Sequence, residues 1–330
     1  MKKIWVAISL SMIVSFFILS TVPVGAADKP FPKILSLGTG GVGGAYNMVG
    51  VGISKYWDKD LGIKIKIAPG LALGNLRKFS EGKIDMIVTP STWDNAAWKG
   101  LEAYGFPKPI RNFRVLCGIY PTIFHFVALK KSGLREIADL KGKRVNCGPK
   151  AATFSKIIGK RLEANGIKFF GDNPDIKKSF ANWNDGNRLL SDGNIDATLA
   201  GMSGLSPMPA TRKLMEEKEI VALEWSKAAL AYQDPVFPVA VIKGELLPYI
   251  TKDHHAIQGG VGSIVVREDF SEELAYALTK TIHQNLAKLG EENPYWRYST
   301  KYPETLTEDL GLPFHPGAIK YWKEVGAWNR

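Results

Sequence analysis

The sequence predicts an α/β fold of two lobes with a ligand site between them. Residues 33–52, KILSLGTGGVGGAYNMVGVG, have the pattern of a short strand, a turn with five glycines and the start of a helix. The same order of strand, turn and helix recurs in residues 63–81 and again in residues 83–100. About 300 residues remain after an N-terminal leader, which is more than one hydrophobic core usually serves and therefore suits two lobes.

The glycine turn marks a place where the backbone can approach a ligand closely. Glycine has no side chain to keep a ligand away, and the start of the helix that follows favours negative charge. Gly38, Gly40 and Gly43 also spell the dinucleotide fingerprint G-x-G-x-x-G, which needs an acidic residue about 20 residues further on. The next strand candidate, residues 63–68, is followed by Pro69-Gly70 and contains no acid. A dinucleotide site is therefore disfavoured.

Residues 1–27 have the pattern of a secretory signal peptide. Two lysines precede an apolar run, residues 4–19, and small residues then offer a cleavage site after Ala26 or Ala27. The alternative, an uncleaved membrane anchor, is disfavoured because the run is short and interrupted by serines. We expect an exported periplasmic protein with no lipid anchor and no later stretch long enough to span a bilayer.

Charge and cysteine content narrow the possible partners and the redox chemistry. The formal net charge is +11, two units of which leave with the leader's lysines, and the remaining lysines and arginines are scattered. This distribution is more typical of a solvated basic surface than of a nucleic-acid site, so no nucleic-acid partner is expected. Cys117 and Cys147 each lie in a strand-like run, and we expect two buried, unpaired thiols.

Polar residues follow several of the predicted strands. Asn75 comes after the second strand, and Ser91 and Thr92 follow the third, which covers residues 83–89. In open α/β sheets, ligands bind beyond the carboxyl ends of the strands. These residues are therefore predicted to line one side of a cleft together with the glycine loop and Tyr46. For Asn75 and Ser91 taken singly, helix capping is an equal alternative.

A run in the middle of the chain, SGLREIADLKGKRV at residues 132–145, resembles the start of the second lobe in periplasmic solute-binding proteins. Four further segments narrow this resemblance: GTGGVGGAYNMVG, EGKIDMIV, SDGNIDATLAG and the C-terminal LPFHPGAIKYWKEVG. In order and spacing they are similar to motifs of the TAXI solute receptors of TRAP transporters. The resemblance implies a type II periplasmic-binding-protein fold that closes on one small ligand, without a cofactor, and delivers it to the membrane subunits of a TRAP permease.

The resemblance also implies which residues contact the ligand. In the second-lobe loop Thr153 matches the family pattern, whereas Ala151 and Ala152 replace small polar or glycine positions. The family's Gln-Ser-Asp after the third strand keeps only its serine, which removes a natural partner for an α-ammonium group. The ligand is therefore expected to be a small organic acid, with a carboxylate lacking an amino group favoured over an amino acid. The predicted ligand contacts are Thr39, Gly40, Gly43, Tyr46, Asn75, Ser91, Thr92, Trp93, Thr153, Phe154, Met202 and Ser203.

Both lobes have expected boundaries in the sequence. Residues 28–129 and 259–330 are predicted to form the first lobe, and residues 130–258 the second. Two apolar runs, separated by Pro121-Thr122, are expected as two strands at residues 113–120 and 123–129. A helix is expected to begin at Ser271 and to bury one stripe of apolar side chains: Leu274, Leu278, Ile282 and Leu286.

The sequence contains no constellation that marks an enzyme. The five histidines are scattered, and none stands at metal-ligand spacing with Asp, Glu or Cys. His315 is interpreted as a structural histidine at a turn, and Arg188 as a solvated helix residue rather than a ligand clamp. No catalytic residue, metal site or cofactor is predicted. Two alternatives stay open: the receptor of an ABC-type importer for aromatic or sulfonate-like solutes, and a periplasmic sensor or enzyme on the same fold.

Overall fold

The computed structural model describes residues 31–149 and 152–330, without the side chains of residues 152–154. The predicted signal peptide, residues 1–27, lies outside the described residues. From Pro32 to Arg330 the chain forms one compact unit.

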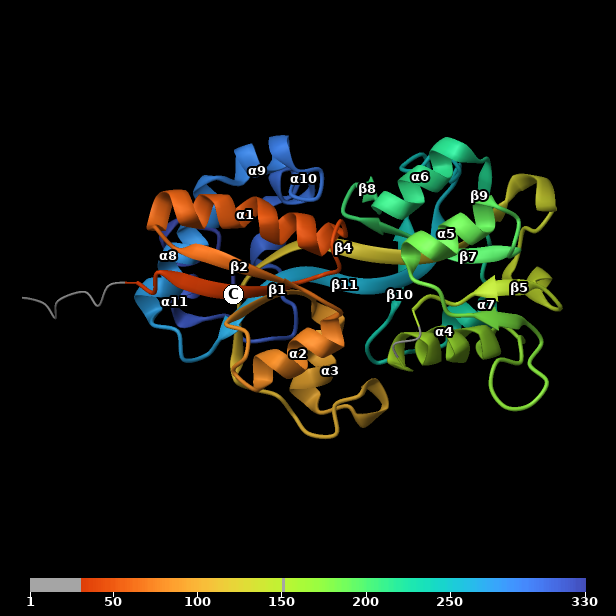
Figure 1. Cartoon of the computed structure of the whole chain (residues 1–330), viewed down its shortest axis with the longest axis horizontal. Coiled ribbons are helices and arrows are strands. Elements are labelled where there is room, and N and C mark those ends of the chain that lie inside the picture. Colours follow the sequence, from red (N-terminus) through yellow and green to blue (C-terminus); the bar gives the residue numbers. More distant parts are fainter. Residues whose placement is uncertain (1–30, 150–151) are drawn as a thin grey trace, which may run out of the picture. The chain divides into compact units, whose positions relative to one another are not determined.

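One mixed sheet of eleven strands organises the described part of this unit (Figure 1). The strands follow in the order β2-β1-β3-β11-β4-β7-β5-β6, with β10 paired to β11, β8 to β7 and β9 to β4. Their bounds are β1 (Ile34–Thr39), β2 (Lys64–Pro69), β3 (Met86–Pro90), β4 (Phe113–Leu129), β5 (Arg144–Asn146), β6 (Lys177–Ser179), β7 (Ala197–Ser203), β8 (Ser206–Pro207), β9 (Ile220–Ala222), β10 (Val239–Ile242) and β11 (His254–Arg267).

Helices connect the strands and pack on the sheet. The α-helices of the described residues are α1 (Ala45–Leu61), α2 (Ala72–Ser80), α3 (Ser91–Lys99), α4 (Ala152–Ala164), α5 (Trp183–Ser191), α6 (Pro209–Glu217), α7 (Lys227–Ala231), α8 (Glu272–Gln284), α9 (Leu286–Glu292), α10 (Arg297–Lys301) and α11 (Pro316–Glu324). Short 3-10 turns are η1 (Glu102–Tyr104), η2 (Lys130–Ser132), η3 (Ile137–Leu140) and η4 (Pro303–Thr307).

Two long antiparallel strands, β4 and β11, lie at the centre of the sheet and connect its two halves (Figure 1). On one side β1 pairs in parallel with β2 and β3; on the other, β5 pairs in parallel with β6 and β7. The predicted α/β class, with two halves joined by crossing strands, is confirmed. The lobe boundaries at residues 129/130 and 258/259 stay a prediction.

The structure corrects the expected break in β4, which runs without interruption through Pro121 and Thr122. Proline has no backbone N–H to donate to a neighbouring strand, so in sheets it is tolerated at edges and bulges. Here Pro121 pairs with Val261 of β11 between two irregularities of register, one at Gln258/Gly260 and one at Gly262/Ser263. The proline therefore lies in an irregular part of the ladder, and apolar residues on both sides keep the strand buried.

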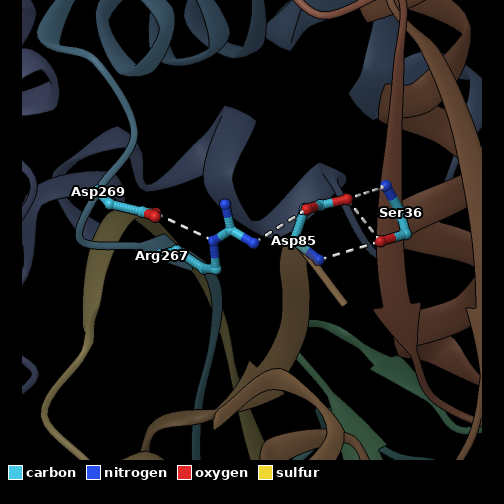
Figure 2. Close-up of polar contacts among 4 residues, drawn as sticks. All are labelled: Ser36, Asp85, Arg267 and Asp269. Carbon is cyan, nitrogen blue, oxygen red and sulfur yellow. Dashed lines mark hydrogen bonds and ion pairs between the residues drawn. The ribbon is translucent and has the colours of Figure 1, made fainter. Parts of the chain in front are cut away.

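Hydrogen bonds from Ser36 to Asp85 join β1 to the start of β3, as Figure 2 shows. Asp85, directly before β3, accepts from both the backbone N–H and the hydroxyl of Ser36, at 2.8 and 2.6 Å. Its own N–H donates to Ser36 Oγ at 3.0 Å. The other carboxylate oxygen lies 3.5 Å from Nη1 of Arg267, whose Nε donates to Asp269. This network holds the ends of β1, β3 and β11 in register.

An aspartate joins two parallel strands in the same way in the other half of the sheet. Asp196, directly before β7, accepts from the backbone N–H of Arg144 on β5 at 2.8 Å. The Arg144 guanidinium donates to both carboxylate oxygens, at 3.2 and 2.8 Å. The Gly-x-Ile-Asp run, which occurs twice in the sequence, thus has a structural role. In each copy the aspartate carboxylate accepts a hydrogen bond from the backbone N–H of a residue on the neighbouring parallel strand.

Several local predictions are confirmed and two boundaries move. The Ser271 hydroxyl caps α8 by accepting from the N–H of Leu274. The predicted apolar stripe is buried, but α8 ends at Gln284, so Leu286 begins α9. Cys117 and Cys147 are both buried and free. Helix α2 begins at Ala72, three residues before the predicted start at Asn75.

Candidate ligand-binding site

A cavity of about 530 Å³ lies where the glycine loop, the crossing strand β4 and the end of β7 meet. The glycine loop contributes residues 39–46, β4 contributes Thr122 and Phe124, and β7 contributes Ser203. This volume is typical of pockets that bind small organic molecules.

Among the described residues, the N-cap residues of five helices line this cavity. These residues are Gly44 (α1), Leu71 (α2), Pro90 (α3), Asn182 (α5) and Met208 (α6). Only Asn182 caps its own helix, by accepting from the N–H of Asp185 at 3.0 Å. The N-termini of α1, α2, α3 and α6 have no side-chain cap. Each such end presents unsatisfied N–H groups and a positive partial charge, so the cavity favours an anion.

The glycine loop is held by its own hydrogen bonds. Gly44 N–H donates to Gly41 O at 2.9 Å, and Gly43 has φ 75°, a conformation that glycine adopts without strain. The Asn47 amide donates to Thr39 Oγ1 at 3.0 Å, and its oxygen accepts weakly from Gly43 N–H at 3.3 Å. The Thr39 hydroxyl in turn donates to Gly40 O. Asn47, which the sequence did not single out, therefore fixes the loop that leads into α1.

Tyr46 joins the first turn of α1 to the crossing strand. Its hydroxyl lies 2.7 Å from Thr122 Oγ1, and its ring stacks on Tyr120 with a centroid distance of 5.6 Å. Burial raises the pKa of the Tyr46 hydroxyl above its ordinary value, so it is neutral and can donate a hydrogen bond. Thr122 pairs directly with Ser203 across β4 and β7. Hydroxyl groups from α1, β4 and β7 therefore meet on one side of the cavity.

Aromatic side chains form much of the remaining wall. Trp93 meets Phe237 edge to face at 5.6 Å, and Phe124 stacks on Trp183 at 4.9 Å with an interplanar angle of 6°. All four rings line the cavity. No Asp, Glu, Lys, Arg or His among the described residues lines it. The described lining is thus mostly apolar and carries no charged side chain, and its polarity comes from hydroxyls, amides and the backbone.

The structure brings about half of the predicted contacts to the cavity. Thr39, Gly40, Gly43, Tyr46, Trp93 and Ser203 line it, and Asn75, Ser91, Thr92 and Met202 do not. Thr153 and Phe154 lie in the first turn of α4, and their side chains are outside the described residues.

The polar side chains outside the lining have structural partners instead. Asn75 donates to Thr39 O at 2.7 Å, so it supports the glycine loop rather than capping α2. Ser91 Oγ accepts from Val261 N–H, and Thr92 Oγ1 donates to Gly259 O, which together hold the start of α3 against β11. Contact between these residues and a ligand stays a prediction.

Several lining residues were not among the predicted contacts; those with aromatic or hydroxyl side chains are Thr122, Phe124, Trp183 and Phe237. Thr122 was read as a break between strands, because Pro121 precedes it. Trp183 carried a usable signal, since it follows Asn182, a residue type that favours the N-cap position, and α5 begins there. Phe124 and Phe237 reach the cavity only through tertiary packing.

Two buried polar groups lie close to this site. Ser203 is completely buried, and its Oγ interacts with the buried Tyr120 hydroxyl, although neither atom makes a hydrogen bond of ordinary geometry. Asp94, next to Trp93 in α3, is also completely buried and accepts from the Ser263 hydroxyl at 3.1 Å. Burial raises the pKa of Asp94 to about 8, and hydrogen bonding from Ser263 opposes that rise.

Other candidate residues have structural roles. His315 caps α11 by accepting from Gly317 N–H at 3.2 Å, and its Nε2 lies 3.1 Å from Phe270 O. Arg188 is exposed on α5 and pairs with Asp185 and Asp192. Among the residues with a described position, no three His, Cys, Asp or Glu side chains cluster as metal ligands would, and no helix has the length and hydropathy of a membrane span.

The fold and this cavity define an α/β protein with a cavity at the N-termini of several helices. A family model described as the NMT1-like family matches residues 37–326, and the chain belongs to that family.

Solved structures similar to this chain include three transport proteins. One is a putative periplasmic sulfonate-binding protein, SsuA, of a sulfonate ABC transporter from Methylobacillus flagellatus KT, with 14% identity, coverage of 90% of this chain and 96% of that chain, and a TM-score of 0.48. Another is the periplasmic aliphatic sulphonate binding protein SsuA from Escherichia coli, with 18% identity, coverage of 89% and 84%, and a TM-score of 0.46. A third is the substrate binding protein of an amino acid ABC transporter, with 16% identity, coverage of 82% and 98%, and a TM-score of 0.43. At these TM-scores the likeness does not assign a ligand or partner to this chain.

Proposed function

We propose that the protein is an extracytoplasmic solute-binding protein that captures a small organic anion in the cavity and delivers it to a membrane importer. The observation that carries this proposal is the convergence of five helix N-termini on one cavity with no charged side chain among its described lining residues. Backbone N–H groups at helix starts bind anions without a basic side chain. The predicted signal peptide supports a periplasmic location.

The arrangement of the two halves supports binding by closure. The cavity takes residues from β1 and α1 on one side of the crossing strands and from β7, α5 and α6 on the other. We propose that residues 28–129 with 259–330, and residues 130–258, move as two lobes about β4 and β11. Closure would remove the ligand from water and would strengthen its electrostatic contacts.

Two importer classes are candidates for the partner. The sequence motifs resemble the TAXI receptors, which supports delivery to a TRAP permease driven by an ion gradient. The alternative is the ATP-driven permease of an ABC transporter, and the described structural relatives belong to such systems. Uptake of the identified ligand by cells that express the protein with each candidate permease distinguishes the two. Collapse of the ion gradient stops TRAP uptake, whereas depletion of ATP at a maintained gradient stops ABC uptake.

Ligand-induced stabilisation tests the binding function itself. A thermal-shift screen of organic acids, amino acids and uncharged amides should find acids that raise the melting temperature. A ligand at about a hundred times its Kd adds about 2.7 kcal/mol to the free energy of unfolding. Each stabilising acid is compared with its own amide, which lacks the charge and should give a much smaller shift. If no compound of any class stabilises the protein, the proposed function is wrong.

A sensor or enzyme on the same fold is the competing class of function. A binding protein returns its ligand unchanged, whereas an enzyme converts it. Incubation of the stabilising acid with a stoichiometric amount of protein, followed by nuclear magnetic resonance of the released ligand, should therefore show the intact compound. Appearance of a product would favour the enzyme.

A further inference from the structure

The lack of charged side chains in the described cavity lining restricts the ligand more than the cavity volume does. An ammonium group brought into such a site needs an anionic partner, because a buried unpaired charge is costly. No acidic side chain among the described lining residues supplies one. A second negative charge on the ligand would likewise need a basic partner, and no Lys, Arg or His lines the described cavity. The site is therefore suited to one negative charge.

The position of that charge follows from a row of hydroxyls. Tyr46 Oη lies 2.7 Å from Thr122 Oγ1, and Thr122 is directly opposite Ser203 in the antiparallel pair β4–β7. Side chains directly opposite in such a pair lie on the same face, about 5 Å apart. Tyr46 also belongs to the first turn of α1, whose N-terminus has no side-chain cap. Hydroxyl donors and a helix N-terminus thus converge on one region of the cavity.

Ser203 points independently to a ligand in that region. It is completely buried and lines the cavity, and its Oγ makes no hydrogen bond of ordinary geometry; the buried Tyr120 hydroxyl that interacts with it lacks one as well. Buried polar groups in folded proteins almost always have a partner, and an unsatisfied one destabilises the protein. An acid group bound beside Ser203 would accept its hydrogen bond and remove this cost.

The aromatic wall indicates what the rest of the ligand is made of. Trp93 comes from α3, Phe124 from β4, Trp183 from α5 and Phe237 from the segment before β10. Rings contributed by four separate elements therefore line the same cavity as the hydroxyl row. Aromatic faces and edges prefer another ring over an aliphatic group of similar size.

We propose that the ligand is an aromatic monoacid without an ammonium group, a carboxylate or sulfonate, whose acid group binds between Ser203 and the first turn of α1. Its ring packs against the aromatic wall formed by Trp93, Phe124, Trp183 and Phe237. This inference rests on the proposed solute-binding function and narrows its ligand class. Asp94 is compatible with it, because the raised pKa of this buried carboxyl keeps it uncharged at neutral pH.

Isothermal titration calorimetry with a matched panel tests the ligand class. Benzoate, phenylacetate, 2-naphthoate and benzenesulfonate carry one negative charge on a ring. Cyclohexanecarboxylate removes the aromatic ring, L-phenylalanine adds the ammonium, terephthalate adds a second charge and benzamide removes the charge. At least one aromatic monoacid should bind about 10-fold or more tightly than L-phenylalanine, terephthalate and benzamide, since an unpaired buried charge or a lost charged hydrogen bond has at least that effect. Cyclohexanecarboxylate keeps the charge and loses only the ring contacts, so it should bind about 2- to 10-fold more weakly than benzoate.

The outcomes separate this inference from the proposed function. Tighter binding of L-phenylalanine or terephthalate than of any aromatic monoacid overturns the inference and leaves the solute-binding function intact. Equal binding of cyclohexanecarboxylate and benzoate overturns the aromatic part. Absence of binding by every compound in this panel overturns the inference, and only the wider thermal-shift screen, if also negative, overturns the proposed function.

Two variants locate the acid group. Ser203→Ala should weaken binding of the best aromatic monoacid about 10-fold, because a hydrogen bond to a charged group is lost. The unliganded protein should lose little stability, because the removed hydroxyl makes no hydrogen bond of ordinary geometry. Ser206→Ala is the matched control: Ser206 pairs with Ser203 in the β7–β8 hairpin but does not line the cavity. Equal affinity of Ser203→Ala and Ser206→Ala would overturn the placement of the acid group.

Discussion

The hydroxyl of Tyr46 lies 2.7 Å from Thr122 Oγ1, which joins the first turn of α1 to the middle of the crossing strand β4. Tyr46 also packs tightly against β11, where a Cβ added at Gly262 would come within 2.6 Å of its ring. The glycine loop, the start of α1 and both crossing strands therefore share one contact. Any movement of the two halves about β4 and β11 would therefore shift Tyr46 and, with it, the glycine loop.

Tyr46→Ala should abolish ligand-induced stabilisation while the unliganded protein stays folded. The change removes the hydroxyl, the stack on Tyr120 and the support of the loop. Gly43→Val should act similarly, because φ 75° strains a β-branched residue by about 1–3 kcal/mol and so displaces the loop. Thermal shift with the best acid measures both, and circular dichroism reports folding. Val51→Ala, exposed on the same helix, is the control. Normal ligand binding by both variants would place the site elsewhere.

Asp85→Ala should lower the free energy of unfolding by about 1–3 kcal/mol. The substitution leaves the partly buried N–H and hydroxyl of Ser36 without their charged acceptor. Asp269→Ala breaks only an exposed pair with Arg267, so its effect should stay below about 1 kcal/mol. Urea denaturation measures both variants. Equal losses would mean that the strand-fastening role of Asp85 is wrong.

Two helical glycines should respond oppositely to alanine. Gly74 is exposed in α2 and nothing lies within 4 Å of an added Cβ, so Gly74→Ala should stabilise by up to about 1 kcal/mol. In α1, a Cβ on Gly50 would lie 2.6 Å from Thr39 Cγ2 and 3.1 Å from Leu37 Cδ2. Overpacking of this kind typically costs about 1–3 kcal/mol and outweighs the gain in helix propensity. Melting temperatures of the two variants that shift in the same direction would contradict this.

The α/β class was predictable because its signals are local. The strand and helix starts around Gly38–Tyr46, and the Ser271 cap of α8, depend on residues close in sequence. The path of β4 was not predictable in this way. Pro121 signals a break when its neighbours in the sequence alone are considered, and only the irregular pairing with β11 explains why the strand continues.

The residues of the candidate site that come directly after strands could be predicted from the sequence. Those that reach the cavity through tertiary packing could not. The loop residues Thr39 to Tyr46 and Trp93 were found from their place after strands. Asn75 stands in an equally suggestive position, yet its amide points back to Thr39 O. Side-chain direction of this kind is set by tertiary contacts. Phe124 and Phe237 have no local pattern that marks them, because their positions follow from where the crossing strands place them.

Stability should fall in acid because His125 is buried. Burial, with His254 nearby, lowers the pKa of His125 to about 3, from an ordinary value near 6.5. Between these two values the unfolded chain binds a proton that the folded chain does not, so the free energy of unfolding falls as pH decreases, by up to about 1.4 kcal/mol per pH unit. Chemical denaturation from pH 7.5 to 4 measures this slope.

His125→Phe tests the assignment of that slope. The variant removes the titrating ring and leaves the Tyr249 hydroxyl without its partner at 2.8 Å, so stability at pH 7 should also fall. The informative quantity is the change between pH 6.5 and 4, which should be smaller than in the parent protein. His254 has a lowered pKa for the same reason of burial and retains part of the slope. An unchanged slope in His125→Phe would assign the acid sensitivity to other groups.

Affinity for an anionic ligand should fall as pH rises through about 8, because Asp94 then ionises behind the cavity wall. Its pKa is raised to about 8 by burial, so below that value it is neutral, and above it a negative charge appears near Tyr46, whose own pKa it raises. Repulsion between two negative charges that face each other across the cavity wall at an intermediate dielectric should weaken binding by about 10-fold. Calorimetric titrations at pH 6.5 and 9 measure the ratio. Asp94→Asn keeps the shape and removes the charge, so its affinity should change much less between these two pH values. If the variant loses affinity as steeply as the parent, other groups cause the loss and Asp94 does not face the bound anion.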